Sequence, residues 1–378
     1  MVTYSESGVD VELGNDVSKI LYNAAKATWK NRQGKLGEIV VPFDDFSGLR
    51  YVNVSGLPEG TVMSLGFDGI GTKVNLAQRT RNHRTVGYDL VAMVADDAVV
   101  RGAEPVLLGS ILDVKSLGPK DAPYLDEVGQ LAEGYIGAAR DANVAVVTGE
   151  TAELPVCVEG YGDRIKYNWG AGVVWFANEK RLFTGMEIKA GDSLVGFYEP
   201  GFRSNGISLV REIMEKTYGP EYQNFNWGIG PYTMADLILI PSKIYSKAIV
   251  AMTGGWDLSR EPKAEVHGVV NVTGGGIPEK LGRVLKPSGL GAEINNPFKP
   301  TSFLLHLQDK GEVTDREAYK AWCFNTGMIA ITPDAKKLME VASWYGIQNQ
   351  EIGFVRKEPG IKIKNVGRYS HSEPWLTF

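Results

Sequence analysis

Residues 61–73 read TVMSLGFDGIGTK, an apolar run followed by a turn with one carboxylate, two glycines and a lysine. The run 61–67 predicts a β-strand, and the turn after it places Asp68 and Lys73 at the carboxyl end of that strand. Ligand sites of α/β proteins favour this end of a sheet. We therefore expect an α/β protein with a ligand site that begins at residue 68.

Helices and strands alternate on both sides of this stretch. In the first half, the patterns predict helices over 15–30, 85–101 and 121–142, strands over 105–113 and 143–148, a strand break at Gly149-Glu150, and a loop or lid from Gly34 to Gly48. After a boundary near 175–185, they predict strands over 193–199 and 266–273, an edge-like strand over 327–332, and helices over 206–216 and 232–252. The order of elements indicates two α/β halves.

The composition is that of a globular protein without electrostatic affinity for nucleic acid. The chain has 378 residues, of which 43% are hydrophobic, and its 40 basic and 45 acidic side chains leave a net charge of −5. The length suggests two domains, each able to bury its own core. The acidic balance gives no reason to expect a nucleic-acid partner, and no stretch reaches the ~18 apolar residues of a membrane helix.

The cysteines and the first residues of the chain bear on the cellular compartment. Cys157 and Cys323 are too few for a disulfide scaffold and fit no zinc-binding spacing, so we expect ordinary buried thiols. The N-terminal residues lack the basic and apolar regions of an export signal. These observations favour a reducing cytoplasm.

The turn after the first strand has the chemistry of a phosphate loop. Gly69 and Gly71 carry no side chains that would keep a phosphate from the backbone N–H groups, Lys73 supplies a mobile positive charge, and Asp68 could hold a divalent cation. The spacing is neither that of a Walker A motif nor that of GxGxxG. An ordinary turn at the end of a strand is the alternative.

The predicted helix after this turn contains three carboxylates in an apolar sequence, YDLVAMVADDAVV. Asp89 and Asp96 are seven residues apart and lie within about 20° of each other around the helix, with Asp97 about 80° further round. A solvated face is the usual interpretation of helical charges. Here the helix has little polar face, and clustered carboxylates favour a bound cation, so metal or metal-nucleotide binding is an equal alternative.

Three later turns repeat the arrangement of a strand end, small residues and polar side chains. They are TGETAELP (148–155), with Gly149, Glu150 and Thr151; GFRSNGISLVRE (201–212), with Arg203, Ser204 and Asn205; and NVTGGGIPEKL (271–281), with Thr273, Gly274 and Gly275. Free N–H groups at a helix start favour an anion. Helix capping and tight packing explain such sequences equally well without a ligand.

In their order along the chain, these motifs resemble one known family. DGIGTK, GYDLVAM, GAEP, GETAELP, SNGISLVR and TGGG are similar to the series found in phosphoribosylformylglycinamidine cyclo-ligase, also called aminoimidazole ribonucleotide synthetase. Tyr4 with Gly8-Val9-Asp10, and PSKIYSKAIV at 241–250, extend the resemblance over residues 4 to 357. The resemblance implies a cytoplasmic ATP- and Mg²⁺-dependent ligase of purine biosynthesis that closes an imidazole ring after ATP phosphorylates the formyl oxygen of a ribonucleotide substrate.

The architecture expected from this resemblance is an α/β (α+β) fold of two domains, 1–178 and 179–378. Each would be a mixed β-sheet flanked by helices, with the active site in the cleft between them. The resemblance also implies a homodimer in which strands of the first domains complete a shared barrel.

The resemblance implies a role for each candidate residue. Asp68 and Asp97 would hold magnesium with Asp96 or Asp89 nearby, and Asp68, Lys73 and Asp97 would be catalytic. Gly69, Gly71, Thr72 and Lys73 would cradle the triphosphate, with Asp89, Asp113, Gly149, Glu150 and Thr151 around the nucleotide. The ribose phosphate of the substrate would bind Arg203, Ser204, Asn205, Thr273, Gly274 and Gly275. The four scattered histidines form no convincing Ser-His-Asp set. Chemistry of this type needs electrostatic stabilisation of the phosphates more than it needs a protein nucleophile.

The sequence departs from the family pattern on the substrate side and in the lid. The family has Asn at the position of Asp96, and His at the positions of Arg203 and Asn271. Cys323 stands at an Asn position, although a small shift would let Asn325 fill it. The glycine-rich lid is replaced by a segment that begins Asp44-Asp45.

These departures leave two alternatives open. One is another ATP-using member of the superfamily, such as selenophosphate synthetase, thiamine-phosphate kinase or the carbamoyl-dehydrating maturation protein. The absence of a reactive Cys before the first strand and at the C-terminus argues against most of these. The other is a catalytically silent relative that binds nucleotide as a structural or regulatory subunit.

Overall fold

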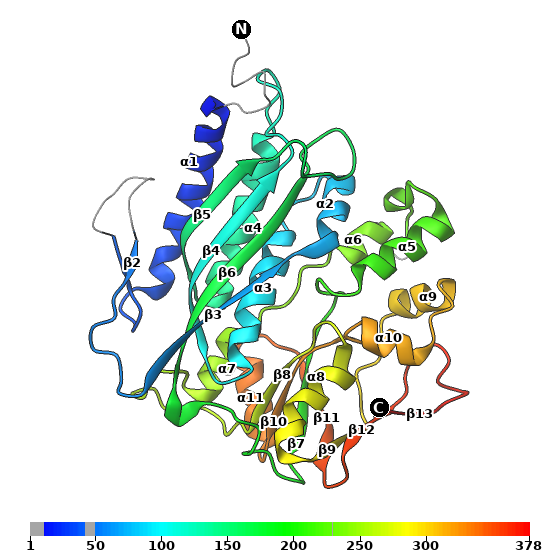
Figure 1. The fold of residues 1–378 in the computed structure, drawn as a ribbon. Helices are drawn as coiled ribbons and strands as arrows, with labels where there is room; N and C mark the ends of the chain where they lie inside the picture. The colour runs from blue at the N-terminus through cyan, green and yellow to red at the C-terminus, as the bar shows by residue number, and fades with distance from the viewer. Residues whose placement is uncertain (1–10, 42–49, 229) are drawn as a thin grey trace.

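The computed structural model describes residues 11–41, 50–228 and 230–378, and it contains one large sheet in each half of the chain (Figure 1). The first sheet has four strands in the order β3-β6-β4-β5, and the second has seven in the order β13-β12-β9-β11-β7-β10-β8. A short strand pair, β1 (Ile39–Val40) and β2 (Tyr51–Val52), stands apart from both. The predicted α/β fold with mixed sheets is confirmed. Each of the two large sheets contains strands from one half of the chain only. The exact domain boundary at residue 178 stays a prediction.

In the first sheet, the strand directions bring three strand ends to one edge. The strands are β3 (Thr61–Gly69), β4 (Glu104–Val114), β5 (Ala145–Glu153) and β6 (Tyr167–Asn178). β3 and β4 each run antiparallel to β6, and β4 runs parallel to β5. The carboxyl ends of β3, β4 and β5 therefore lie at the same edge.

Helices α1 (Val11–Thr28), α3 (Val86–Val99) and α4 (Leu125–Ala142) cover one face of this sheet (Figure 1). The short α2 (Val74–Thr80) follows the turn after β3. Two glycines allow α3 and α4 to cross closely: a Cβ on Gly87 would lie 2.6 Å from Tyr135 N, and one on Gly134 would lie 2.0 Å from Arg84 O. This contact fixes the position of α3, which carries the carboxylates.

The second sheet is covered on both faces. Its strands are β7 (Ser193–Tyr198), β8 (Gly268–Asn271), β9 (Gly291–Ile294), β10 (Thr326–Thr332), β11 (Asn349–Arg356), β12 (Gly360–Lys364) and β13 (Trp375–Thr377). Its helices are α5 (Ile207–Tyr218), α6 (Met234–Ile238), α7 (Ser246–Thr253), α8 (Gly276–Leu285), α9 (Ser302–Lys310), α10 (Asp315–Ala321) and α11 (Ala335–Trp344). Helix α7 joins the halves, because Ile249 shares a buried cluster with Val99 of α3 and Phe197 of β7.

Three predicted elements differ from the structure. The strand predicted over 143–148 continues through Gly149 to Glu153, because its parallel partner β4 extends to Val114. The strand over 327–332 is central and not edge-like: β10 lies between β7 and β8 and is buried along its length, as its unbroken apolar run permits. The helix over 232–252 is two helices, α6 and α7, separated by a loop that contains Pro241, a residue that interrupts helices.

Other expectations concern the cysteines, the lid and the N-terminus. Cys323 is buried as expected, but Cys157 is exposed. The lid residues Asp44 and Asp45, and the motif that begins at Tyr4, lie outside the described residues. In the part of the chain that the structure describes, no helix is both long and apolar enough to span a membrane.

The crossing of α3 and α4 gives a first prediction. Gly134→Ala should lower the free energy of unfolding by about 1–3 kcal/mol, because its methyl group would collide with backbone that must then move. Gly129→Ala on the same helix is the matched control: its methyl group meets nothing within 4 Å, and it should stabilise by up to about 1 kcal/mol through helix propensity. Thermal unfolding of both variants measures the difference, and equal melting temperatures would contradict the close crossing.

Candidate active site at the junction of the two sheets

Asp68 lies near the end of β3 on the helix-covered face of the first sheet, because it pairs with Ala171, a buried residue of β6. Partial burial raises the pKa of Asp68, and the negative charge of Asp97 adds to the increase. The Gly69 N–H, which donates to Asp68 Oδ1 at 2.7 Å, opposes it. Two carboxylates that interact in this way favour a cation between them.

The three carboxylates of α3 divide between the interior and the surface. Asp89 and Asp96 are completely buried, whereas Asp97 is exposed. This division agrees with the helical spacing, which puts the first two on one face and the third to its side. Only Asp97 is therefore open to a ligand.

Lys73 is buried in an ion pair and is not the mobile cation that the sequence predicted. Its Nζ donates to Asp89 Oδ1 and to the Ile240 carbonyl, each at 2.9 Å. Asp89 also accepts a hydrogen bond from the backbone N–H of Ser242 at 3.2 Å. The pair thus ties the turn after β3 to the loop between α6 and α7.

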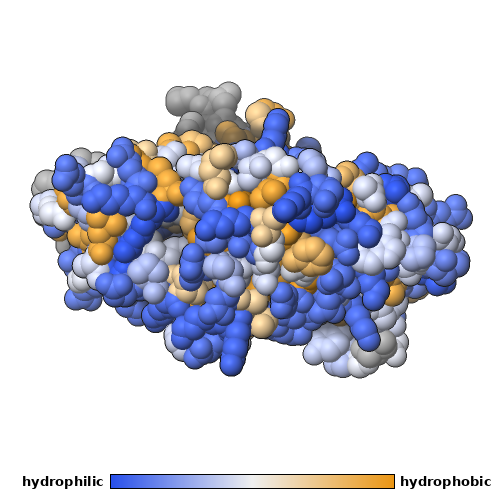
Figure 2. Space-filling view, turned by 90° about the horizontal axis from the view of Figure 1, so that it is seen from below, coloured by the Kyte–Doolittle hydropathy of each residue, from blue (hydrophilic) through white to orange (hydrophobic). Residues whose placement is uncertain are grey.

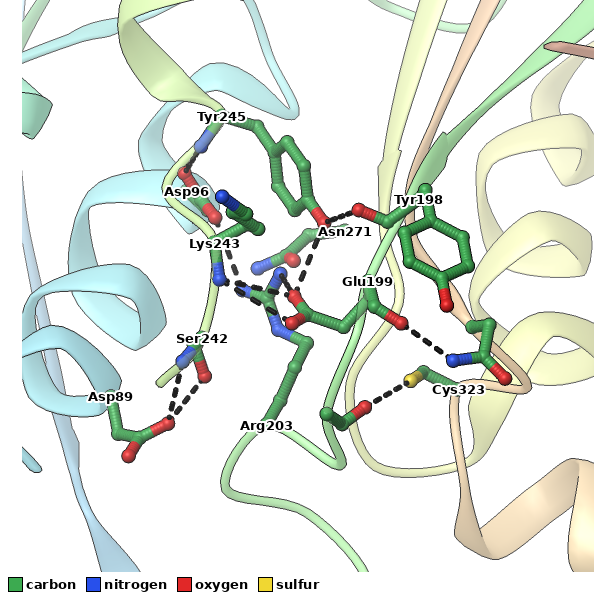
Figure 3. Close-up of polar contacts among 12 residues, drawn as sticks. Asp89, Asp96, Tyr198, Glu199, Arg203, Ser242, Lys243, Tyr245, Asn271 and Cys323 are labelled. Atoms are coloured by element: carbon green, nitrogen blue, oxygen red, sulfur yellow. Dashed lines mark hydrogen bonds and ion pairs between the residues drawn. The ribbon is translucent and has the colours of Figure 1, made fainter. Parts of the chain in front are cut away.

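Asp96 and Arg203 form a second buried pair across the junction (Figure 3). Arg203 Nη2 donates to Asp96 Oδ2 at 3.1 Å, while the N–H groups of Tyr245 and Ser246 each donate to Asp96 Oδ1 at 2.9 Å. Asp96 of the first half thereby caps the N-terminus of α7 in the second. Both its oxygens are used inside the protein, so Asp96 does not present the open metal-ligand position that we expected.

Glu199 completes this network, and the sequence analysis did not single it out. It lies directly after β7, and its carboxylate faces Arg203 Nη1 at 3.4 Å and Tyr245 Oη at 3.1 Å (Figure 3). Burial raises the pKa of Glu199 to about 7, against the opposing charges of Arg203 and Lys73. A carboxylate at the end of an apolar strand, before Pro200-Gly201, was the available signal.

On the side of the second half, several polar atoms lack partners. Asn271 Nδ2 donates to Asp97 Oδ1 at 2.8 Å. Asn271 Oδ1, Ser204 Oγ and Asn205 Nδ2 are buried without a hydrogen-bond partner among the described residues. Asn205 lies beside Gly274, where an added Cβ would be 3.3 Å from its Oδ1. Buried polar atoms are rarely left unpaired, so a polar ligand at the end of β8 would satisfy them.

The structure does not bring every predicted residue to this junction. Glu150 pairs with Ile111. The neighbouring pair in the same strands is Gly149 with Ser110, and it lies in line with Asp68 across the sheet. Adjacent residues of a strand point to opposite faces, so Glu150 and, by the same count, Asp113 lie on the helix-free face. Three strand spacings, about 14 Å, also separate β5 from β3.

The acidic residues do not form a metal site by themselves. The described part of the chain contains no group of three or more His, Cys, Asp or Glu side chains that could hold a metal ion. Asp68 and Asp97 are the two interacting carboxylates that remain open. Such a pair suits Mg²⁺, which commonly binds one or two carboxylates together with the phosphates of a substrate.

The network around Glu199 predicts a pH dependence of stability. Its folded-state pKa of about 7 lies above the ordinary value of 4.5, so between these values the folded protein binds more protons than the unfolded one. The free energy of unfolding should therefore fall as the pH rises through this interval, and Glu199→Gln should remove that part of the fall. Denaturant unfolding across this pH range measures it, with the exposed Glu212→Gln as control. Parallel curves for wild type and Glu199→Gln would refute the assignment.

Comparisons with known proteins show the family and the fold of the two halves. The family described as AIR synthase related protein, N-terminal domain, matches residues 51–174, and AIR synthase related protein, C-terminal domain, matches 189–365. Solved structures with the same fold include thiamine-monophosphate kinase from Stenotrophomonas maltophilia, with a TM-score of 0.63 at 13% identity over 91% of this chain and 95% of that one. The hydrogenase maturation protein HypE of E. coli has a TM-score of 0.60 at 15% identity over 96% of this chain and 95% of its own.

Curated relatives match over most of the chain. Phosphoribosylformylglycinamidine cyclo-ligase of Desulfitobacterium hafniense is 32% identical over 87% of this chain and 88% of its own. The enzyme of the same name from Thermococcus kodakarensis is 29% identical over 97% and 99%, respectively. The resemblance in the motifs is thus confirmed, and the chain belongs to the phosphoribosylformylglycinamidine cyclo-ligase family.

Proposed function

We propose that this protein is an ATP-dependent ligase that converts formylglycinamidine ribonucleotide to 5-aminoimidazole ribonucleotide in purine biosynthesis. Family membership over nearly the whole chain is the observation that carries the proposal. The formyl oxygen attacks the terminal phosphorus of ATP and ADP leaves. The ribosyl-bearing nitrogen then attacks the activated carbon, the C–O bond breaks, phosphate departs and the nitrogen loses a proton.

The residues at the junction fit a magnesium-bound triphosphate. Mg²⁺, when bound, would neutralise charge on the phosphate oxygens. Asp68 and Asp97 would hold it, and Asn271 orients Asp97 by donating to its Oδ1 at 2.8 Å. The turn from Gly69 to Thr72 would offer its backbone to the phosphates.

Lys73 takes a positioning role in this proposal. Because its ammonium group lies against Asp89 and the Ile240 carbonyl, it holds the phosphate turn against the second half and does not contact the nucleotide directly. Glu150, Asp113, Gly149 and Thr151 remain predicted nucleotide contacts. Glu150 and Asp113 lie on the helix-free face, through which the dimer proposed below would form.

The second half supplies the site for the substrate's phosphate. Helices α5 and α8 begin after Gly206 and Gly275, and their first N–H groups favour an anion. The unpartnered Ser204 Oγ and Asn205 Nδ2 are further donors beside them, with Thr273 and Gly274 close by in sequence. Arg203 is committed to Asp96 and Glu199, so we assign it a positioning role. The substrate thereby meets the nucleotide between the halves.

The proposal predicts that Asp68→Asn and Asp97→Asn each lower turnover by about 100-fold or more, because each removes a ligand that stabilises the transferring phosphoryl group. Phosphate release that depends on formylglycinamidine ribonucleotide measures turnover. Asp163→Asn, at an exposed aspartate, is the control. Nucleotide hydrolysis that does not respond to this substrate would reject the cyclo-ligase and favour a silent relative.

We also propose a cytoplasmic homodimer, formed through the helix-free face of the first sheet. Met63, Leu65 and Phe67 alternate along the edge strand β3 and are 65%, 52% and 77% exposed, and Ile111 of β4 adds to them. An exposed edge strand with apolar residues is a site for association. On the face that is seen from below, by contrast, hydrophobic residues stand in separate groups among hydrophilic ones (Figure 2).

Light scattering should give twice the chain mass of 41.3 kDa for the wild type. Phe67→Asp should shift the protein to the monomer mass, because a carboxylate would be buried without a partner at the interface. Met186→Asp changes a similarly exposed apolar residue on a loop of the second half, and it should leave the dimer intact. A monomeric wild type would refute this assembly.

A further inference from the structure

Lys280 of α8 is a cationic side chain that none of the roles proposed above uses. It is partly exposed, and in the part of the chain that the structure describes it forms no hydrogen bond or salt bridge. The other charged side chains of the helix, Glu279 and Arg283, pair with each other at 2.7 Å. Lys73 and Arg203 are both held by buried carboxylates. Lys280 is therefore available to a ligand, whereas those two residues are not.

Contacts on two sides place the start of α8 beside the open carboxylates. Asn271, at the end of β8, donates to Asp97 Oδ1 at 2.8 Å. The turn between β8 and α8 lies against Asn205, just before α5. Helix α5 in turn meets the phosphate turn after β3, where Thr72 Oγ1 lies 3.0 Å from Ser208 Oγ. The N-terminal end of α8 therefore faces the proposed ligand site.

Helix geometry directs the side chain of Lys280 toward this end. Side chains of an α-helix lean toward its N-terminus and cover the preceding turn. The residue four positions earlier is Gly276, which has no side chain to obstruct the lysine. The adjacent Glu279 adopts the same lean, because its carboxylate lies over Gly275, four positions before it. The flexible stem of Lys280 can thus carry its ammonium group to the ligand site.

The charge of Lys280 acts on the carboxylate of Asp68. Burial raises the pKa of Asp68, and Lys280 opposes that rise, so the two side chains lie close enough to interact across the junction. Asp68 and Asp97 present two negative charges, which repel an approaching phosphate. An ammonium group offsets part of this repulsion, and it offers three donors to phosphate oxygens.

We propose that Lys280 is the mobile cation of the active site. Without ligand, it neutralises part of the charge of Asp68 and Asp97; when these carboxylates hold Mg²⁺, it contacts the phosphate oxygens of the nucleotide. A compact charge on a flexible stem suits both tasks. The inference rests on the proposed function, because it requires a magnesium-bound triphosphate at the junction. Lys280 thereby takes the task that the sequence suggested for Lys73, which is buried.

Lys280→Met tests both tasks, because it removes the charge and keeps an unbranched side chain. Mn²⁺, a spectroscopic probe for Mg²⁺, should bind the nucleotide-free variant more tightly, by up to about fivefold, the range of an exposed ion pair. A non-hydrolysable ATP analogue with Mg²⁺ should bind about tenfold more weakly, as for the loss of a hydrogen bond to a charged group. Titration of Mn²⁺ by electron paramagnetic resonance and calorimetry of the analogue measure the two shifts.

Two further variants control for folding and for net charge. Lys280→Arg keeps the charge, so its Mn²⁺ affinity should stay close to that of the wild type and its affinity for the analogue should exceed that of Lys280→Met. Lys286→Met removes the same charge from an exposed residue at the far end of α8, about 9 Å further along the helix axis. It should bind both probes like the wild type.

Shifts in opposite directions are the signature of the inference, because a merely structural role would weaken both affinities together. Weakening of both, or equal affinities of Lys280→Met and Lys286→Met, would overturn it even in an active cyclo-ligase. Opposite shifts in a protein that does not turn over formylglycinamidine ribonucleotide would uphold the inference and reject only the proposed reaction. A wild type that binds neither probe would overturn both.

Discussion

The arrangement of the candidate site depends on buried charges that are paired across the two halves. Arg203 of the second half neutralises Asp96 of α3. Lys73, which is paired with Asp89, donates a hydrogen bond to the carbonyl of Ile240 in the loop before α7. Removing one partner of such a pair typically costs about 3–5 kcal/mol, because a charge is left buried and uncompensated. The halves therefore meet in one register. In that register Asn271 reaches Asp97, and the open carboxylates face the second half.

Neighbouring residues on one helix thus have separate tasks. Asp96 points inward and caps α7, while Asp97, one residue later, is turned about 100° around the helix and stays open. The same sequence position that resembled a metal ligand is structural here. Its partner Arg203 is the other departure that the motif resemblance indicated, and the two residues form one contact. Such a paired change is compatible with an intact catalytic face.

Local patterns predicted much of this structure. Alternation of elements, the strand before Asp68 and the helical spacing of Asp89, Asp96 and Asp97 follow from periodicity, and the structure agrees with them. Long-range pairings could not be predicted in this way. The burial of Lys73 depends on a carbonyl 167 residues away in the chain, and the central place of β10 depends on which strands pair. Glu199 was missed because one acid at a strand end looks like an ordinary turn residue until Arg203 and Tyr245 surround it.

The cap on α7 has a consequence for biosynthesis of the chain. Asp96 leaves the ribosome 149 residues before Tyr245, whose N–H it binds, which is about 7–30 seconds at ordinary rates of translation. During that interval Asp96 lacks the N–H donors of Tyr245 and Ser246, and a nascent first half must keep this carboxylate hydrated. The last steps of maturation are then an intramolecular docking event, in which the late-emerging segment displaces that water and sets the two halves into their working geometry.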